Sequence, residues 1–112
     1  MWQILQTEEF EDWLTTLNES TKEDIFANVT VLGVHGPSLG RPRVDTIKNS
    51  SHKNMKELRV QSSENPYRIF FAFDPERKAI LLIGGNKKGD KRFYDKFIPI
   101  ADRLFDQYLE DL

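Results

Sequence analysis

Apolar residues near the N-terminus recur at the spacing of a helix. A short strand-like start at Trp2 and Ile4 is followed by Thr7, whose hydroxyl can accept a hydrogen bond from an amide in the first turn of a helix. The acidic Glu8 and Glu9 then suit the positive end of the helix dipole. The stripe predicted to face the core consists of Phe10, Trp13, Leu14 and Leu17.

A second helix is predicted directly after the first. Ser20 and Glu23 have the spacing of a capping box, and Gly33 or Gly36 with Pro37 can end the helix. Its buried stripe is predicted to consist of Ile25, Phe26, Val29 and Leu32. Two helices joined by so short a turn are expected to pair antiparallel as a helical hairpin.

From Met55 the hydrophobic period changes to two, which is typical of strands. Leu58, Val60, Ile69, Phe71 and Phe73 then point one way, and Glu57, Arg59, Arg68, Phe70 and Ala72 the other. Residues 79–83 are apolar at every position, as in a central strand covered on both faces. Residues 37–54 contain Pro37, Gly40 and Pro42 and are expected to form an irregular connector.

The C-terminal segment returns to a helical period. Its apolar stripe is Phe97, Ala101, Leu104, Phe105, Tyr108 and Leu109, and Pro99 is expected in the first turn of this helix. The predicted element order is therefore β-α-α-β-β-β-α. We expect an α+β fold in which the N-terminal helical hairpin packs on an antiparallel-dominated β-sheet.

Composition limits the possible classes of protein. A chain of 112 residues is too short for two cores of normal size, so we expect a single domain over residues 1–112. The absence of cysteine excludes a disulfide framework, a cysteine zinc finger and a thiol nucleophile. Without an apolar run near the roughly 18 residues of a membrane span, and without a signal-peptide layout, we expect a soluble, cytoplasmic protein with no membrane partner.

The formal net charge of −2 conceals a segregation of charge along the chain. Residues 1–24 carry one basic and seven acidic groups, and residues 97–112 carry one basic and four acidic groups. The intervening residues 41–96 carry fourteen basic and seven acidic groups. A basic middle between acidic ends predicts a polyanionic partner for the middle segment, unless the charges merely follow local helix and strand chemistry.

The most concentrated polar segment is residues 84–90, Gly-Gly-Asn-Lys-Lys-Gly-Asp, which follows the apolar strand. Its glycines would let the backbone approach a ligand closely, and Lys87 and Lys88 would bring positive charge suited to phosphate. It is not a Walker loop, because no glycine-rich frame ends in Lys-Ser or Lys-Thr. The alternative interpretation is a glycine-rich turn with solubilising lysines.

Strand alternation adds two arginines to the candidate site. Arg59 and Arg68 are expected on the sheet face opposite the helical hairpin, together with Glu57. The planar guanidinium matches two phosphate oxygens at once. Arg68 lies among apolar neighbours, so solubility explains it poorly, whereas Arg59 could simply pair with Glu57.

One aromatic residue and two histidines complete the set of candidates. Tyr94 could stack on an unpaired base or exchange a proton with a ribose hydroxyl, or it could be an aromatic at the edge of the core. His35 and His52 lie away from the arginine face, so we assign them to structure or solvent. Neither has a partner at metal-binding spacing, and we expect no metal and no cofactor.

Several short motifs occur together in a characteristic order. They are Leu39-Gly40-Arg41-Pro42 with Val44-Asp45, Met55-Lys56-Glu57-Leu58-Arg59, Tyr67-Arg68-Ile69, and Lys87-Lys88-Gly89-Asp90 through Phe93-Tyr94. In this combination the chain resembles the phage-derived branch of the RelE/HigB toxins of bacterial type II toxin–antitoxin modules. The resemblance covers nearly the whole chain and implies the RelE-like fold.

The resemblance also implies an activity and partners. Members of this family are endoribonucleases that cut messenger RNA, many of them on the ribosome, and a cognate antitoxin, here expected to be a helix-turn-helix protein, holds them inactive. The implied reaction is metal-independent attack of the ribose 2′-hydroxyl on the neighbouring phosphate, which leaves a cyclic phosphate. Basic residues would balance the charge of the phosphorane.

Site residues follow from the same resemblance, position by position. Arg68 would contact the scissile phosphate, Lys87 or Lys88 would support the leaving group or the phosphate, and Tyr94 would stack or help in proton transfer. The residues expected to contribute to RNA binding are Arg59, Glu57, Asp90 and Arg41. The alternative function is a module that binds RNA, the ribosome or the antitoxin and has lost nuclease activity.

Overall fold

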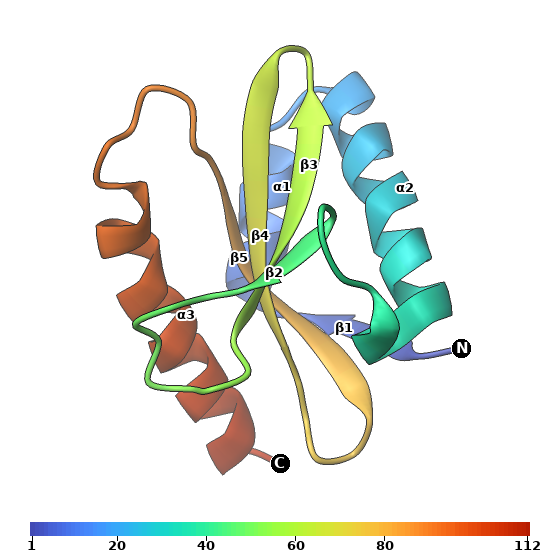
Figure 1. Cartoon of the computed structure of the whole chain (residues 1–112), viewed down its shortest axis with the longest axis vertical. Helices are drawn as coiled ribbons and strands as arrows, with labels where there is room; N and C mark the ends of the chain where they lie inside the picture. Colours follow the sequence, from blue (N-terminus) through green and yellow to red (C-terminus); the bar gives the residue numbers. More distant parts are fainter.

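A five-stranded sheet forms the middle layer of the protein, for which the computed structural model describes residues 1–112 (Figure 1). Its strands are β1 (Gln3–Gln6), β2 (Val44–Thr46), β3 (Lys56–Ser62), β4 (Asn65–Phe73) and β5 (Lys78–Asn86). The spatial order is β1-β5-β4-β3-β2, and only the β1–β5 pair is parallel. The antiparallel-dominated sheet and the predicted element order are confirmed, with β2 as an additional short strand inside the expected connector.

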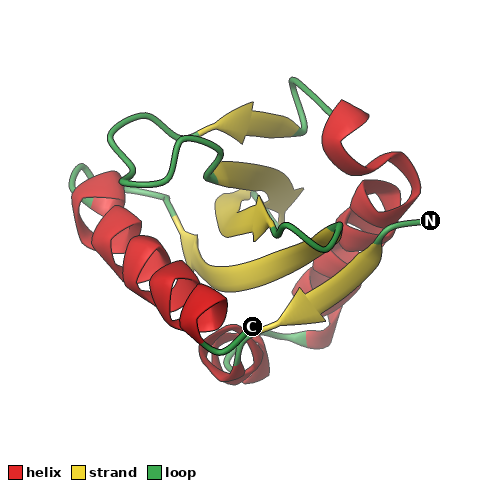
Figure 2. Cartoon of the chain, turned by 90° about the horizontal axis from the view of Figure 1, so that it is seen from below, coloured by secondary structure: helices red, strands yellow, loops and turns green.

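Helices cover both faces of this sheet (Figure 2). The N-terminal helices α1 (Glu8–Thr15) and α2 (Glu19–His35) lie on one face, and α3 (Phe93–Glu110) lies on the other. The α1–α2 face buries Phe10, Ile25, Leu32, Val44, Leu58, Val60, Tyr67, Ile69, Phe71, Ala79 and Leu81. The α3 face buries Ile47, Met55, Phe70, Ala72, Ile80, Leu82, Phe93, Ala101, Leu104 and Phe105. The predicted alternation of β3 and β4, and the prediction that β5 is covered on both faces, are therefore confirmed.

The N-terminal ends of the helices differ in part from the expectation. Thr7 caps α1 as predicted, since its side chain accepts a hydrogen bond from the Phe10 amide at 3.0 Å. The predicted Ser20 cap is wrong: the Asn18 side chain accepts from the Thr21 amide at 2.8 Å, and Ser20 lies in the first turn of α2. Asn18 and Ser20 are both favourable cap residues, and the earlier one fixes the start.

Two apolar positions also differ from the expectation. The sequence predicts Phe26 in the buried stripe of α2, but this residue is 73% exposed, because Ile25 rather than Phe26 faces the sheet. The sequence predicts Pro99 in the first turn of the C-terminal helix, but α3 already begins at Phe93, so the proline lies inside the helix. Its side chain lies on the exposed side of α3.

The reversal between β4 and β5 is tied to α3 by a buried carboxylate. The Asp74 side chain is fully buried and accepts a hydrogen bond from the Tyr108 hydroxyl at 2.6 Å. It also accepts from the backbone amides of Glu76 and Lys78, and the Lys78 ammonium lies 3.1 Å away. Burial alone would raise the pKa of Asp74, but these hydrogen bonds outweigh it and lower the pKa below its usual range.

The connector between β2 and β3 is held against α3. The Ser50 hydroxyl and the Ser51 amide both bind the Asp102 carboxylate, and the ring of His52 contacts Asp106 at 2.7 Å and packs edge-on against Phe105. His52 therefore has the structural role that was expected. None of the α-helices combines the length and the apolar composition that a membrane-spanning helix needs.

Candidate active site

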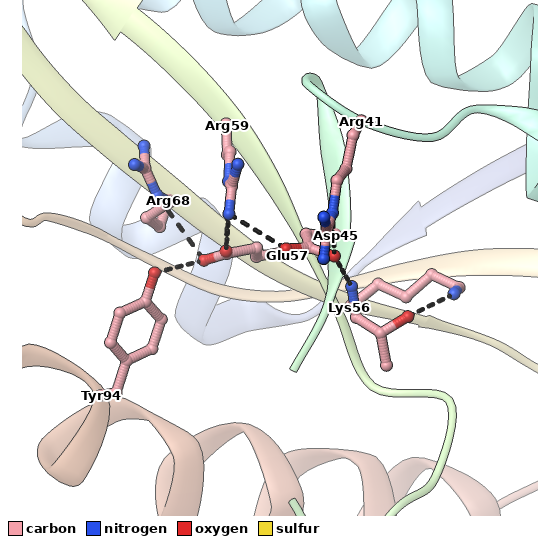
Figure 3. Close-up of polar contacts among 8 residues, drawn as sticks. Arg41, Asp45, Lys56, Glu57, Arg59, Arg68 and Tyr94 are labelled. Atoms are coloured by element: carbon pink, nitrogen blue, oxygen red, sulfur yellow. Dashed lines mark hydrogen bonds and ion pairs between the residues drawn. The ribbon is translucent and has the colours of Figure 1, made fainter. Parts of the chain in front are cut away.

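A buried carboxylate lies at the centre of the candidate site (Figure 3). The Glu57 side chain is 4% exposed, and its Oε1 accepts a hydrogen bond from the Tyr94 hydroxyl at 2.7 Å. Its Oε2 accepts from Nε and one terminal nitrogen of Arg59, both at 3.2 Å. The Nε of Arg68 lies 3.6 Å from Oε1. Four of the residues proposed from the sequence thus converge on one point.

Strand register explains this convergence. Arg59 of β3 stands directly opposite Arg68 of β4, and Glu57 lies two residues before Arg59 on the same face. Because side chains alternate along a strand, all three project toward the face that α3 covers, as predicted. Tyr94 enters from the first turn of α3, so helix and strands meet at the carboxylate.

The cluster continues along the sheet to a residue that the sequence did not single out. Asp45 of β2 pairs in register with Glu57, and its carboxylate binds Arg59 at 3.2 Å and Arg41 at 3.1 Å. The hydrogen bond from Arg41 is the main cause that holds the pKa of Asp45 below its usual range. Asp45 lies in the segment that is predicted to be an irregular connector, so no strand alternation points to it. The Val44-Asp45 pair nevertheless belongs to the quoted motifs.

The Tyr94 hydroxyl is neutral in this arrangement. Burial raises its pKa, and the hydrogen bond to Glu57 and the charge of that carboxylate raise it further, while Arg68 acts in the opposite direction. A phenol with a raised pKa remains a proton donor near neutral pH, which matches its 2.7 Å hydrogen bond to the carboxylate.

Arg68 has donor capacity that the protein leaves unused. Its side chain is 15% exposed, and one terminal nitrogen donates to the carbonyl of Tyr67 at 3.1 Å. Its Nε is buried and has no hydrogen-bond partner, the only such side-chain atom in the chain. The buried Nε faces the Glu57 carboxylate at 3.6 Å, so the donors that an incoming anion could reach are on the terminal nitrogens of the partly exposed guanidinium. A cavity of about 260 Å³ adjoins this cluster and is lined partly by Glu57, Asp45 and Tyr94.

The glycine pair before the lysines does not have the expected role. Both glycines lie within β5, and a Cβ atom at Gly84 would come within 2.3 Å of the Trp13 ring. A Cβ atom at Gly85 would come within 2.7 Å of Phe97 on the other face. The space above these glycines is filled by aromatic rings from α1 and α3, so neither a phosphate cradle nor a plain turn describes them.

The two lysines after this strand have different surroundings. Lys87 is half-buried, and its Nζ lies 5.3 Å from the centre of the Tyr94 ring, within the range of a cation–π contact. Lys88 is exposed, and its backbone amide donates to the side chain of Asn86. Lys87 is therefore the loop cation that adjoins the Glu57 cluster.

The remaining candidates lie outside this cluster. The Asp90 carboxylate accepts from the Arg92 amide at 3.0 Å and binds Lys96 at 2.6 Å, which lowers its pKa. It holds the turn before α3. His35 is exposed at the end of α2, and no group of three or more His, Cys, Asp or Glu residues is placed to hold a metal ion.

Comparison with known proteins identifies relatives that match most of the chain. The family described as "Phage derived protein Gp49-like (DUF891)" matches residues 12–106. The provisionally named toxin HigB3 of Mycobacterium tuberculosis (strain ATCC 25618 / H37Rv) is 43% identical over 107 residues, which cover 95% of this chain and 92% of that protein. The provisionally named toxin HigB2 of the same organism is 50% identical over 99 residues, 87% of this chain, but the match spans only 49% of that protein.

A solved structure has the same fold. An arginine-to-alanine double mutant of the E. coli toxin RelE in the free state superimposes with a TM-score of 0.59 at 11% identity, covering 86% of this chain and 94% of that one. At this identity the likeness concerns the fold alone. The family match, the two HigB relatives and this fold agree with the resemblance of the quoted motifs, and the chain belongs to the Gp49-like family of RelE/HigB-type toxins.

Proposed function

We propose that this chain is an endoribonuclease toxin that cleaves messenger RNA on the ribosome, in the cytoplasm, and that a helix-turn-helix antitoxin neutralises it. The observation that carries the proposal is the convergence of Arg59, Arg68 and Tyr94 on the buried Glu57, with the Nε of Arg68 left without an acceptor. Basic groups fixed around one point stabilise the negative charge that a phosphodiester gains in the transition state.

Arg68 is proposed to bind the scissile phosphate. Its guanidinium is held in place through the Tyr67 carbonyl and stays close to Glu57 without a hydrogen bond to it. A phosphate oxygen would accept from the terminal nitrogens of Arg68, and the neighbouring Arg59 would add a second positive charge. Arg41 extends this line of cations through Asp45 toward the edge of the sheet, where flanking RNA would pass.

Tyr94 and Glu57 are proposed to accept the proton of the attacking hydroxyl. As the ribose 2′-hydroxyl gives its proton to the Tyr94 oxygen, Tyr94 passes its own proton across the 2.7 Å hydrogen bond to Glu57. The 2′-oxygen forms a bond to phosphorus and the bond from phosphorus to the 5′-oxygen breaks. Protonation of the leaving 5′-oxygen by Lys87 then yields a 2′,3′-cyclic phosphate and a 5′-hydroxyl.

The position of Lys87 supports its choice over Lys88 as this acid. The ammonium of Lys87 faces the Tyr94 ring, whereas Lys88 is exposed and is proposed to contact flanking RNA. The mechanism uses no metal ion, so cleavage should persist in excess chelator. Asp90 contributes indirectly, since it fixes the turn from which Tyr94 enters the site.

The test compares wild type, Arg68→Ala and Arg103→Ala on translating ribosomes and in growing bacteria. Arg103 is an exposed cation of α3 without an ion pair and serves as a matched control. Wild type and the control should arrest growth and cleave transcripts with and without chelator, and Arg68→Ala should lower cleavage by roughly 100-fold or more while keeping the fold. Equal cleavage by all three, or RNA binding without strand scission by the wild type, would contradict the proposal.

A further inference from the structure

A second concave surface lies on the face of the sheet opposite the candidate active site. It is an apolar groove of about 560 Å³ between α1 and α2, with Ile4 and Leu81 of the sheet among its lining residues. Eight of its eleven lining residues are hydrophobic. The groove exists because α1 packs on β5 while α2 packs on β3, so the two helices leave a gap between them.

The groove has an unpartnered aromatic wall. Phe26 of α2 lines it and is 73% exposed, and it is the only exposed aromatic residue of the chain. The opposite wall contains Phe10 and Leu14 of α1. An exposed apolar surface of this kind, next to a concavity, is typical of a site for another protein.

The charges around the groove limit what can occupy it. Half of α1 is acidic, with Glu8, Glu9, Glu11 and Asp12 among its eight residues and no basic residue. The charged residues that line the groove itself are Glu23 and Lys22, and Lys22, the single Lys or Arg of residues 1–40, is engaged with Glu19 at 3.5 Å. The four carboxylates of α1 do not line the groove but belong to the helix that forms one of its walls, and we call them its acidic rim. This rim would repel RNA and anionic lipid. It also disfavours a second copy of the chain, because a two-fold interface would bring the same acidic rims together.

We infer that this groove binds an amphipathic segment of the cognate antitoxin, with apolar side chains directed at Phe26 and basic side chains directed at the acidic rim. A partner of this chemistry satisfies both the apolar floor and the charge around it. The inference rests on the antitoxin part of the proposed function but not on catalysis. The groove and the Glu57 cluster lie on opposite faces of the sheet, so the segment binds without touching Arg68.

The test measures binding of the full-length antitoxin of the same module by calorimetry, at low and high salt. Phe26→Glu removes the apolar wall and adds a like charge to the rim, so it should weaken binding roughly tenfold or more and let the toxin escape neutralisation in growing cells. Val34→Glu is the control, since Val34 is also exposed on α2, at 54%, but does not line the groove. It should bind as wild type. Glu23→Lys should weaken binding and reduce its salt dependence.

Each result decides the inference separately from catalysis. Unchanged affinity of Phe26→Glu, or an equal loss in Val34→Glu, would overturn it. A wild-type dimer that Phe26→Glu dissociates, with antitoxin affinity unchanged, would assign the groove to a second copy instead. Arg68→Ala should bind the antitoxin normally. A wild-type protein that shows no nuclease activity but depends on Phe26 for antitoxin binding would refute the nuclease proposal and support this one.

Discussion

Substituting Gly84 by alanine tests whether the glycine pair serves packing or ligand approach. The new Cβ atom would lie 2.3 Å from Cζ3 of Trp13 and 2.6 Å from two further atoms of that ring. Trp13 cannot move freely, because its ring packs against Phe10 and Tyr67 with centroid distances of 5.7 and 6.1 Å. One of these rings, or the strand itself, must shift.

The expected loss of stability in Gly84→Ala follows from two opposing effects. Overpacking of a close-packed core costs about 1–3 kcal/mol. Alanine also reduces the entropy of the unfolded chain, which stabilises by about 0.4–1 kcal/mol. The net destabilisation is then about 1–2 kcal/mol. With an unfolding entropy of about 2.1 cal/mol/K per residue, this lowers the melting temperature of a 112-residue chain by about 4–9 °C.

Thermal unfolding followed by circular dichroism measures this shift. Gly40→Ala is the matched control, because a Cβ atom there meets nothing within 4 Å and the backbone φ is not positive; its melting temperature should be unchanged or slightly higher. In a Trp13→Leu background, Gly84→Ala should cost less, since the clash is gone. A Gly84→Ala protein that melts like wild type but no longer binds RNA would refute the packing explanation and restore a ligand role.

Three further outcomes are expected from side chains described above. Asp74→Asn should lower the free energy of unfolding by about 2–4 kcal/mol at pH 7. Because the pKa of Asp74 is lowered in the folded state, its stabilisation is complete above the unfolded pKa near 4 and is lost as the pH falls through the folded pKa. The stabilities of wild type and variant should therefore converge in acid. Retention of the full gap in acid, or no effect of Tyr108→Phe, would contradict this. His52→Ala should speed amide exchange across residues 48–54 while the exposed Lys53→Ala does not; equal exchange in both would contradict the anchoring role. Tyr94→Phe should lower stability by about 1–2 kcal/mol and slow cleavage at saturating RNA; unchanged turnover would remove Tyr94 from the proton path.

Local pattern predicted most of the fold because the decisive signals are strong over several residues. The alternation of β3 and β4 placed Arg59 and Arg68 on one face with Glu57, and the structure confirms that face. The three-residue strand β2 has no such signal. It exists because Val44 and its neighbours pair with β3, which is a tertiary event that no local period reports.

Irregularities in the ladder explain the other differences. The register between β4 and β5 shifts beside Phe70 and Phe71, so that Leu82 and Ile83 both pack toward α3. This bulge sets which face Gly84 and Gly85 present to the aromatic rings of α1 and α3. The position of a bulge depends on the packing of both faces of the sheet, so local sequence does not predict which way these glycines face.

The opposed arginines of the candidate site need an internal anion. Arg59 and Arg68 stand directly opposite each other across two strands, an arrangement that like charges make unfavourable. Glu57 contacts both and offsets part of their charge, and Asp45 does the same for Arg41 and Arg59. Under the proposed function a phosphate therefore competes with Glu57 for the guanidinium groups. A single phosphate gains little from this exchange, whereas an RNA strand whose neighbouring phosphates also reach the lysine loop gains several contacts at once. The carboxylate that stabilises the fold therefore also favours binding of a polyanion over binding of an isolated anion.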